Sequence, residues 1–316
     1  MNILLLLVGF VALIFGASKL VDAASGLAAK FGIPNIVIGL TIVAFGTSAP
    51  ELVVNIIAAV NENTQMVLGN VLGSNIFNIL GILGISAIIY PLAVKTNTTW
   101  YEIPLNLLAA IVVLVVSADI FLIGDGQNII SRSDAILLLL FFTVFLVYTI
   151  AVSKSEKTAE KTEVKQYKTV TAVFFIIIGL AGLIVGGQLI VSSATSIAQQ
   201  IGLSERVIGL TIVSIGTSLP ELATSIVAVK KKNVDIAIGN VVGSNIFNVF
   251  FVLGVSAFIN PVSIAQNAFL DIVLNIVAGF ILFVFVFTGK YRQIDRWEGI
   301  VFLMLYIAYL VWLIGF

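Results

Sequence analysis

Two nearly identical stretches decide the fold: VIGLTIVAFGTSAPEL at residues 37–52 and VIGLTIVSIGTSLPEL at residues 207–222, 170 residues later. Each lies in a hydrophobic segment and carries one glutamate, Glu51 or Glu221. A charged side chain inside a membrane is costly unless it is paired or hydrated, so such a residue marks a functional site by default. The duplicated glutamate is therefore the first candidate for the chemistry of this chain.

The composition is that of an integral membrane protein. Hydrophobic residues make up 60% of the 316 residues and charged residues only 10%, with a mean hydropathy of +1.17, whereas about one quarter of a soluble domain is charged. A membrane-spanning helix needs about 20 apolar residues. Ten segments meet this length: 3–26, 36–60, 66–90, 103–123, 133–152, 170–198, 206–229, 235–259, 268–287 and 297–315. Such continuous runs exclude a porin-like barrel and predict an all-α membrane protein with ten transmembrane helices.

The basic residues indicate how these helices are oriented. The connections after the odd-numbered helices carry thirteen of the sixteen Lys and Arg residues: Lys30, Lys95, Lys154, Lys157, Lys161, Lys165, Lys168, Lys230, Lys231, Lys232, Lys290, Arg292 and Arg296. The opposite side carries only Arg132 and Arg206. Basic residues are enriched in cytoplasmic loops, so we expect a multi-pass protein of the cell membrane with both termini outside. The first segment is too long for a signal peptide, and we expect it to be retained as a helix.

The chain contains neither Cys nor His, and its net charge is zero. Disulfides, thiolate chemistry, imidazole bases and the usual ligands of zinc and copper are therefore excluded. Only oxygen ligands remain for a cation. We expect the protein to be embedded in the lipid bilayer, with no nucleic-acid partner and no cofactor.

The repeat extends well beyond the two opening stretches. Residues 37–91 align without a gap with residues 207–261, and more than half of the aligned positions are identical. We therefore expect two repeats, residues 1–152 and 169–316, joined by a cytoplasmic linker at residues 153–168. Five helices is an odd number, so the second repeat enters the membrane from the opposite side and the repeats are inverted. Transporters built in this way bind substrate near the midplane, on interrupted helices, and work by alternating access.

Interruptions are visible in the sequence at GTSAP (residues 46–50) and GTSLP (residues 216–220). Proline lacks an amide donor and clashes with the carbonyl one turn earlier. We therefore expect a break in each helix that frees carbonyl groups at residues 44–47 and 214–217. Free carbonyl oxygens in a membrane are potential cation ligands.

Hydroxyl and amide side chains surround the two glutamates in the predicted helices. Thr47 and Ser48 share a helix face with Glu51, and the second repeat has the same arrangement in Thr217, Ser218 and Glu221. The next helix of each repeat adds a polar stripe: Asn70, Ser74 and Asn78 in the first, and Asn240, Ser244 and Asn248 in the second. This set of hard oxygen donors suits calcium or sodium better than magnesium.

The motifs GTSAPEL and GNVLGSNIFN, repeated as GTSLPEL and GNVVGSNIFN, resemble the two alpha-repeats of the calcium/cation antiporter superfamily, and most closely its sodium/calcium exchanger branch of the prokaryotic type. The resemblance implies a 5+5 exchanger with four clustered ion sites. It assigns calcium to Glu51 and Glu221 with the carbonyls of Thr47 and Thr217. It also implies flanking sodium sites, formed on one side by Ser48, Ser74 and the Ala44 carbonyl, and on the other by Thr217, Ser218, Ser244 and the Ser214 carbonyl. Asn78 and Asn248 would close the middle.

One departure affects the expected ion preference. Some archaeal members and the potassium-dependent branch have Asp where this chain has Asn248, so we expect no potassium dependence, and the sodium stoichiometry stays open. Two facing carboxylates also bind protons, which keeps calcium/proton exchange as an alternative, although the acidic helix-3 motif of that branch is absent. Asn70, Asn75, Asn240 and Asn245 are expected to pack between helices or to support the ligands through hydrogen bonds.

The expected function is secondary antiport of Ca²⁺ against Na⁺ by alternating access, with a monomer sufficient for transport. A passive cation channel would more naturally be an oligomer with a ring of ligands around one pore. An intramembrane enzyme is disfavoured because the chain has no His and no pair of Asp in the middle of a helix.

Overall fold

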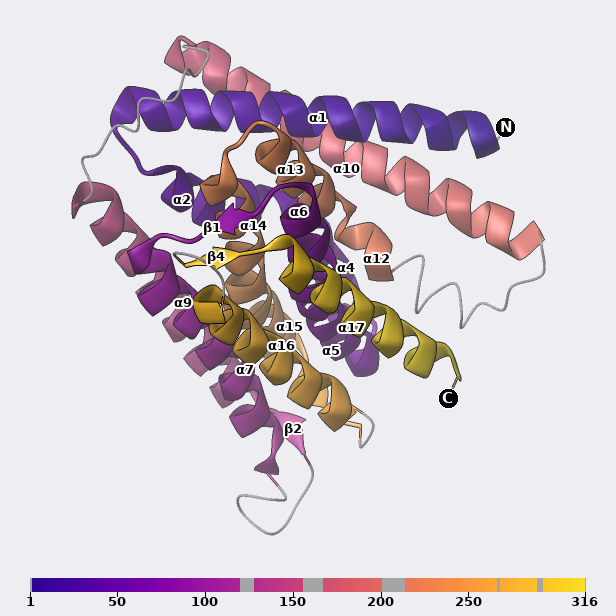
Figure 1. Cartoon of the computed structure of the whole chain (residues 1–316). Helices are drawn as coiled ribbons and strands as arrows, with labels where there is room; N and C mark the ends of the chain where they lie inside the picture. The colour runs from indigo at the N-terminus through magenta and orange to yellow at the C-terminus, as the bar shows by residue number, and fades with distance from the viewer. Residues whose placement is uncertain are drawn as a thin grey trace.

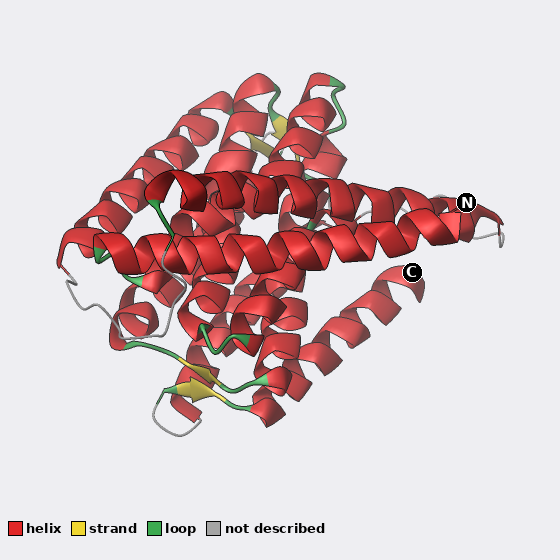
Figure 2. Ribbon diagram, turned by 90° about the horizontal axis from the view of Figure 1, so that it is seen from above, coloured by secondary structure: helices red, strands yellow, loops and turns green. Residues whose placement is uncertain are grey.

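The computed structural model describes residues 2–119, 128–155, 167–200, 214–265, 268–288 and 292–315, and these residues are almost entirely helical (Figures 1 and 2). The first half contains α1 (Asn2–Phe31), α2 (Asn35–Ile38), η1 (Gly39–Val43), α3 (Ala44–Thr47), α4 (Ala49–Val60), α5 (Thr64–Ile76), η2 (Phe77–Leu83), α6 (Gly84–Ile89), β1 (Leu92–Ala93), η3 (Thr98–Glu102), α7 (Ile103–Ser117), β2 (Ile129–Ile130) and α9 (Arg132–Ser155). The elements marked η are π-helical turns.

The second half repeats much of this order. It contains α10 (Thr169–Gln200), α12 (Ser214–Thr217), α13 (Leu219–Lys230), α14 (Val234–Phe247), η5 (Asn248–Leu253), α15 (Gly254–Ile259), β3 (Val262–Ser263), α16 (Ala268–Thr288), β4 (Gln293–Ile294) and α17 (Arg296–Gly315). Of the predicted linker at 153–168, the first residues continue α9, and residues 156–166 lie outside the described part of the chain.

Within the described residues, eight helical runs are long and apolar enough to cross a membrane, and the bent pair Asn35–Thr47 and Ala49–Val60 provides a ninth. The remaining predicted span, at 206–229, is described only from Ser214 onward, as α12 and α13. The runs Thr64–Ile89 and Val234–Ile259 are the central ones, because 78% of each apolar window is buried, compared with 22–39% in the other six straight runs.

Two short antiparallel ladders connect the halves. β1 pairs with β4, and β2 pairs with β3. β1 contacts α14, and beside it Lys95 forms an ion pair of 2.7 Å with Asp235 at the start of α14. β3 contacts α5. The helical run that begins with α5 ends at β1, so α5 and β1 lie at opposite ends of that run. The equivalent strands β1 and β3 therefore lie at opposite ends of the bundle. This is the arrangement expected of inverted repeats.

Both predicted helix breaks are present. In the first half α3 ends at Thr47 and α4 begins at Ala49, with a bend of 46° between them. In the second half α12 ends at Thr217 and α13 begins at Leu219. Each proline lies in the first turn of the helix after the break, where its missing amide costs no helical hydrogen bond. The sequence reasoning did not anticipate the π-helical turns, which start at Phe77 and Asn248 in the central runs.

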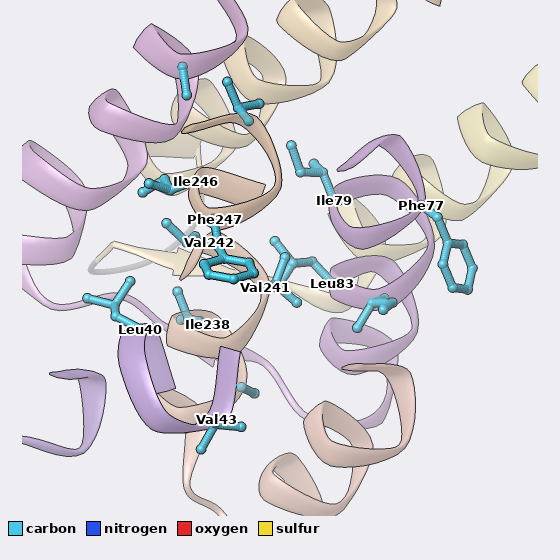
Figure 3. Close-up of a cluster of buried hydrophobic side chains, with 14 of the residues drawn as sticks. Leu40, Val43, Phe77, Ile79, Leu83, Ile238, Val241, Val242, Ile246 and Phe247 are labelled. Atoms are coloured by element: carbon cyan, nitrogen blue, oxygen red, sulfur yellow. The ribbon is translucent and has the colours of Figure 1, made fainter. Parts of the chain in front are cut away.

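Apolar side chains hold the broken helix of the first half against the centre. Figure 3 shows Leu40 of η1 beside Ile238 of α14, and η1 packs along α14. This close approach depends on Gly239, where an added Cβ would lie 2.7 Å from the carbonyl oxygen of Ile36. Gly243 is equally close, because a Cβ added there would lie 2.8 Å from the carbonyl oxygen of Leu40.

The helices α1 and α10 lie side by side across one face of the bundle (Figures 1 and 2). Glycines let their backbones touch: a Cβ added at Gly16 would lie 2.6 Å from the carbonyl oxygen of Gly179, and one added at Gly186 would lie 2.7 Å from the amide nitrogen of Leu13. Both helices also present large apolar side chains on their exposed faces. We therefore treat α1 and α10 as one paired unit.

Candidate cation site

The predicted site residues converge where the two helix breaks meet the two central runs. Nine of them are almost fully buried side chains: Thr47, Ser48, Glu51, Ser74, Asn78, Ser218, Glu221, Ser244 and Asn248. Thr217 is partly buried, and Ala44 is buried at the end of the first broken helix. The side chain of Ser214 lies outside what the structure describes.

Each glutamate accepts a hydrogen bond from a serine of the opposite repeat. Ser48 Oγ donates to Glu221 Oε1 at 2.9 Å, and Ser218 Oγ donates to Glu51 Oε1 at 3.1 Å. Ser48 and Ser218 are the residues at the two helix breaks, and each glutamate lies in the first turn of the helix that follows its break. The serine of each repeat therefore contacts the glutamate of the other repeat. One oxygen of each carboxyl group is thus fixed by the opposite repeat.

The other carboxyl oxygens have no hydrogen-bond partner. Glu51 Oε2 and Glu221 Oε2 are buried and have no hydrogen-bond partner, and among the other predicted site residues the same holds for Ser74 Oγ, Asn78 Oδ1 and Asn248 Oδ1. Leaving a buried polar atom without a partner costs about 1–3 kcal/mol, and more for a charged group. A cation bound among these oxygens would remove that cost.

The asparagines of the central runs orient two of these oxygens. Asn78 Nδ2 donates to Asn245 Oδ1 at 2.9 Å, and Asn248 Nδ2 donates to Asn75 Oδ1 at 3.1 Å. The Nδ2 atoms of Asn75 and Asn245 in turn donate to each other's backbone carbonyls. Because the donor ends of Asn78 and Asn248 are occupied, their acceptor oxygens are left for the site. Asn75 and Asn245, which we expected to pack or to support the ligands, therefore fix the orientation of these two amides.

The threonines at the breaks are held by the opposite repeat as well. Thr47 Oγ1 donates to Asn240 Oδ1 at 3.1 Å, and Thr217 Oγ1 donates to Asn70 Oδ1 at 3.4 Å. Asn240 Nδ2 donates to Ser225 Oγ, and Asn70 Nδ2 donates to Asn55 Oδ1.

Sequence reasoning gave no role to Asn55 or Ser225. Each follows its glutamate by four residues, which places it on the same face of the helix. That spacing was the available signal.

The carbonyl of Ala44 differs from the expectation. It accepts the backbone amide of Ser48 at 3.0 Å, so the break does not release it from the helix. The Thr47 hydroxyl also lies 3.3 Å away, but its single proton is shared with Asn240 Oδ1 at 3.1 Å, so the Ala44 carbonyl keeps acceptor capacity. At the second break the Ser218 amide donates to the carbonyl oxygen of Ile215 at 3.1 Å. The two serines of the central runs also differ: Ser244 Oγ donates to Glu221 Oε1 at 3.4 Å, whereas Ser74 Oγ has no partner.

The donor set fits a hard cation. The described residues include no cluster of three or more His, Cys, Asp or Glu side chains, so two carboxylates must be supplemented by neutral oxygens. Hydroxyl, amide and carbonyl oxygens are ligands that Ca²⁺ accepts, with six to eight of them in a flexible shell.

Comparison with known proteins assigns the family. The family model described as sodium/calcium exchanger protein matches residues 1–151 and 171–315. This chain belongs to the sodium/calcium exchanger family. Its members are membrane transporters and not enzymes, so the expected superfamily and the expected absence of an enzymatic activity are both confirmed.

Curated relatives in this exchanger family match along most of their length. The chain is 39% identical to the inner membrane protein YrbG of Escherichia coli over 84% of this chain and 82% of that protein. It is 39% identical to the putative antiporter CaxA of Alkalimonas amylolytica, with 96% and 95% covered. It is 32% identical to the sodium/calcium exchanger MaX1 of Methanosarcina acetivorans, with 98% and 97% covered.

Solved structures of the sodium-calcium exchanger NCX_Mj share the fold. One, soaked with 10 mM Na⁺ and zero Ca²⁺, superimposes with a TM-score of 0.83 at 33% identity, covering 97% of both chains. Another, soaked with zero Na⁺ and Ca²⁺, gives a TM-score of 0.84 at the same identity and coverage. The predicted fold is confirmed: the exchanger is an all-α membrane protein with ten transmembrane helices in two inverted five-helix repeats.

Proposed function

We propose that this protein exchanges Ca²⁺ for Na⁺ across the membrane by alternating access, with the ions bound between Glu51 and Glu221. The observation that carries the proposal is the group of five buried, unpartnered oxygens from both repeats, two of them carboxyl oxygens. Family membership supports it, as do the sodium/calcium exchanger MaX1 and the NCX_Mj structures soaked with Na⁺, Ca²⁺ or Sr²⁺.

In this proposal, charge balance couples the two ions. Two ionised glutamates are neutralised by one Ca²⁺ or by two Na⁺, and a neutralised site crosses the apolar barrier at lower cost than a doubly charged one. Calcium takes the two carboxylates with the carbonyls of Thr47 and Thr217.

The proposed sodium ligands lie on either side of these groups: Ser48, Ser74 and the Ala44 carbonyl, and Thr217, Ser218, Ser244 and the Ser214 carbonyl. The Ala44 carbonyl accepts one backbone amide, and its second lone pair can bind an ion when the Thr47 hydroxyl donates to Asn240. Asn78 and Asn248 complete the middle of the site.

We further propose the orientation expected from the basic residues, with both termini outside and residues 153–168 in the cytoplasm as a linker between repeats 1–152 and 169–316. Contacts between the basic connections support a common side. Lys95 pairs with Asp235, and Arg292 Nη1 donates to Thr96 Oγ1. A localisation in the inner membrane agrees with the relative YrbG.

The main alternative is calcium/proton exchange. Two carboxylates would suffice for carrying protons, but proton exchange gives no reason for the neutral oxygens of Ser74, Asn78 and Asn248 to remain unpartnered. Sodium, which needs several oxygen ligands, accounts for them.

The test is calcium flux in liposomes that contain the purified protein, with the sodium, potassium and proton gradients varied one at a time. We expect calcium uptake to follow an outward sodium gradient and to be indifferent to potassium. Uptake that follows the proton gradient and ignores sodium would assign the protein to proton exchange. Uptake without any opposing gradient would indicate a channel.

A further inference from the structure

The contact between the paired unit of α1 and α10 and the rest of the bundle is strongest at one end. Lys231, in the turn between α13 and α14, places its Nζ 2.7 Å from Asp22 Oδ1, 2.9 Å from Ser18 Oγ and 3.0 Å from the carbonyl oxygen of Ser18. Two residues on, Asn233 Nδ2 donates to Ser25 Oγ at 2.8 Å. Three side chains of α1 are thus tied to a single turn.

The sequence alone suggested a different partner for Asp22. Lys19 is three residues away on the same helix, and such a pair is common on helices. In the structure Lys19 Nζ lies over the rings of Phe15 and Phe175, at 5.3 and 4.9 Å from the centroids. Asp22 instead reaches across to the second repeat.

The inverted repeat supplies an internal comparison. The turn between α4 and α5 is equivalent to the turn between α13 and α14, and the two share their backbone form. Glu62 and Lys232 have φ of 59° and 58°, and Asn63 and Asn233 each cap the next helix. The positions equivalent to Lys231 and Asp22 are Asn61 and Ser192, which are neutral.

The equivalent contact is not made. Ser192 is exposed and its Oγ donates to Leu189 within its own helix, and Thr195 Oγ1, the counterpart of the Ser25 hydroxyl, has no partner. α1 packs along α13, whereas among the described residues α10 has no comparable packing along α4. The bundle is therefore closed against the paired unit at the Lys231 end and released from it at the Asn61 end.

We infer that Lys231, Ser18 and Asp22 form a latch that holds the exchanger in the access state seen here, and that the opposite state has no equivalent ion pair. Exchanging the conformations of two inverted repeats produces the opposite access state. In that state α10 approaches Asn61, α1 leaves Lys231, and the ion pair is lost. With the proposed orientation, the latch closes the cytoplasmic side and favours the state open to the outside.

Disulfide crosslinking reports the two states directly, because the chain has no cysteine. A reporter with Asn61→Cys and Ser192→Cys can crosslink only when the outer end closes. We expect slow oxidative crosslinking of this reporter in membranes. Adding Lys231→Gln or Asp22→Asn should accelerate it by about two- to fivefold, the range expected for one partly exposed ion pair.

Two controls separate the latch from a general loosening of the turn. Lys230→Gln removes the same charge from the neighbouring position and should leave the crosslinking rate unchanged. Combining Asp22→Lys with Lys231→Asp restores an ion pair with reversed signs and should return the crosslinking rate to that of the reporter alone. This result would also show that the protein still folds with both positions changed.

An unchanged rate in both single variants would overturn the inference, as would an equal acceleration by Lys230→Gln. The inference rests on the proposed alternating access, but the crosslinking requires no particular counter-ion. If the protein exchanges protons for calcium, the flux test fails for sodium while the crosslinking result stands.

Discussion

At the residue scale, each half of the site is completed by the other half. The serine at each helix break donates to the glutamate of the opposite repeat, so neither glutamate has a full set of partners within its own repeat. The remaining carboxyl oxygen of each glutamate has no partner, and neither have neutral oxygens of Ser74, Asn78 and Asn248. Removing one carboxylate therefore removes half of the charge of a shared site.

The first prediction concerns these two carboxylates. Glu51→Gln and Glu221→Gln should each reduce sodium-driven calcium uptake to background in liposomes, because a single carboxylate does not neutralise a divalent ion. Glu62→Gln makes the same change on an exposed turn and should transport normally. Normal uptake by either site variant would remove that residue from the site.

The second prediction concerns the centre of the site. Asn248→Asp adds a third carboxyl group among buried oxygens, where charges interact strongly. We expect tighter calcium binding, by about tenfold, and a weaker response to sodium, measured as the calcium and sodium concentration dependence of uptake. Asn260→Asp, at the end of the same helical run, is the matched control. If both variants behave like the parent, Asn248 is not near an ion.

The sequence was sufficient to locate both glutamates, both serines at the breaks and the polar stripes, because the repeat doubled every signal. It was not sufficient to show which oxygens stay free. The Ala44 carbonyl still accepts the amide of Ser48, and the acceptor oxygens of Asn78 and Asn248 are left for the site because Asn75 and Asn245 bind their amide nitrogens. Which oxygens stay free depends on contacts between the repeats, and local sequence patterns do not show these contacts.

At the element scale, breaks and glycines determine which helices are fixed and which are paired. Proline predicted the breaks correctly, but no residue type signals a π-helical turn, so the ones at Phe77 and Asn248 were missed. The pairing of α1 with α10 depends on backbone contact at Gly9, Gly16, Gly179 and Gly186. A side chain at any of these positions must push the helices apart.

The third prediction tests that pairing. Gly16→Val should destabilise the protein by about 1–3 kcal/mol, the usual cost of overpacking, because a Cβ there would lie 2.6 Å from the Gly179 carbonyl oxygen. The measurement is the unfolding temperature in detergent, which should fall. Ile14→Val alters an exposed apolar side chain of the same helix and serves as the control. An unchanged unfolding temperature for Gly16→Val would show that the two helices are not in close contact.

At the scale of the whole molecule, the inverted repeat places equivalent strands at opposite ends of the bundle. The odd number of helices per repeat was enough to predict this inversion from the sequence. The latch was not predictable, because the sequence assigned Asp22 to its own helix and contained no sign that Lys231 would reach it.

The fourth prediction tests the orientation. With Ala93→Cys in β1 and Ser263→Cys in β3, both exposed, a membrane-impermeant maleimide added to intact cells should label only the second variant. Disrupted membranes should allow labelling of both, which confirms that both thiols are reactive. Labelling of the first variant alone in intact cells would reverse the proposed orientation.

The two strand ladders also constrain how the protein is made. β1 pairs with β4 and β2 pairs with β3. During synthesis both strands of the first half therefore stay unpaired until the strands of the second half have left the ribosome. β4 precedes only the final helix, α17. The first repeat therefore remains incomplete until nearly the whole chain has been translated, and premature termination after α16 would leave β1 with an open edge.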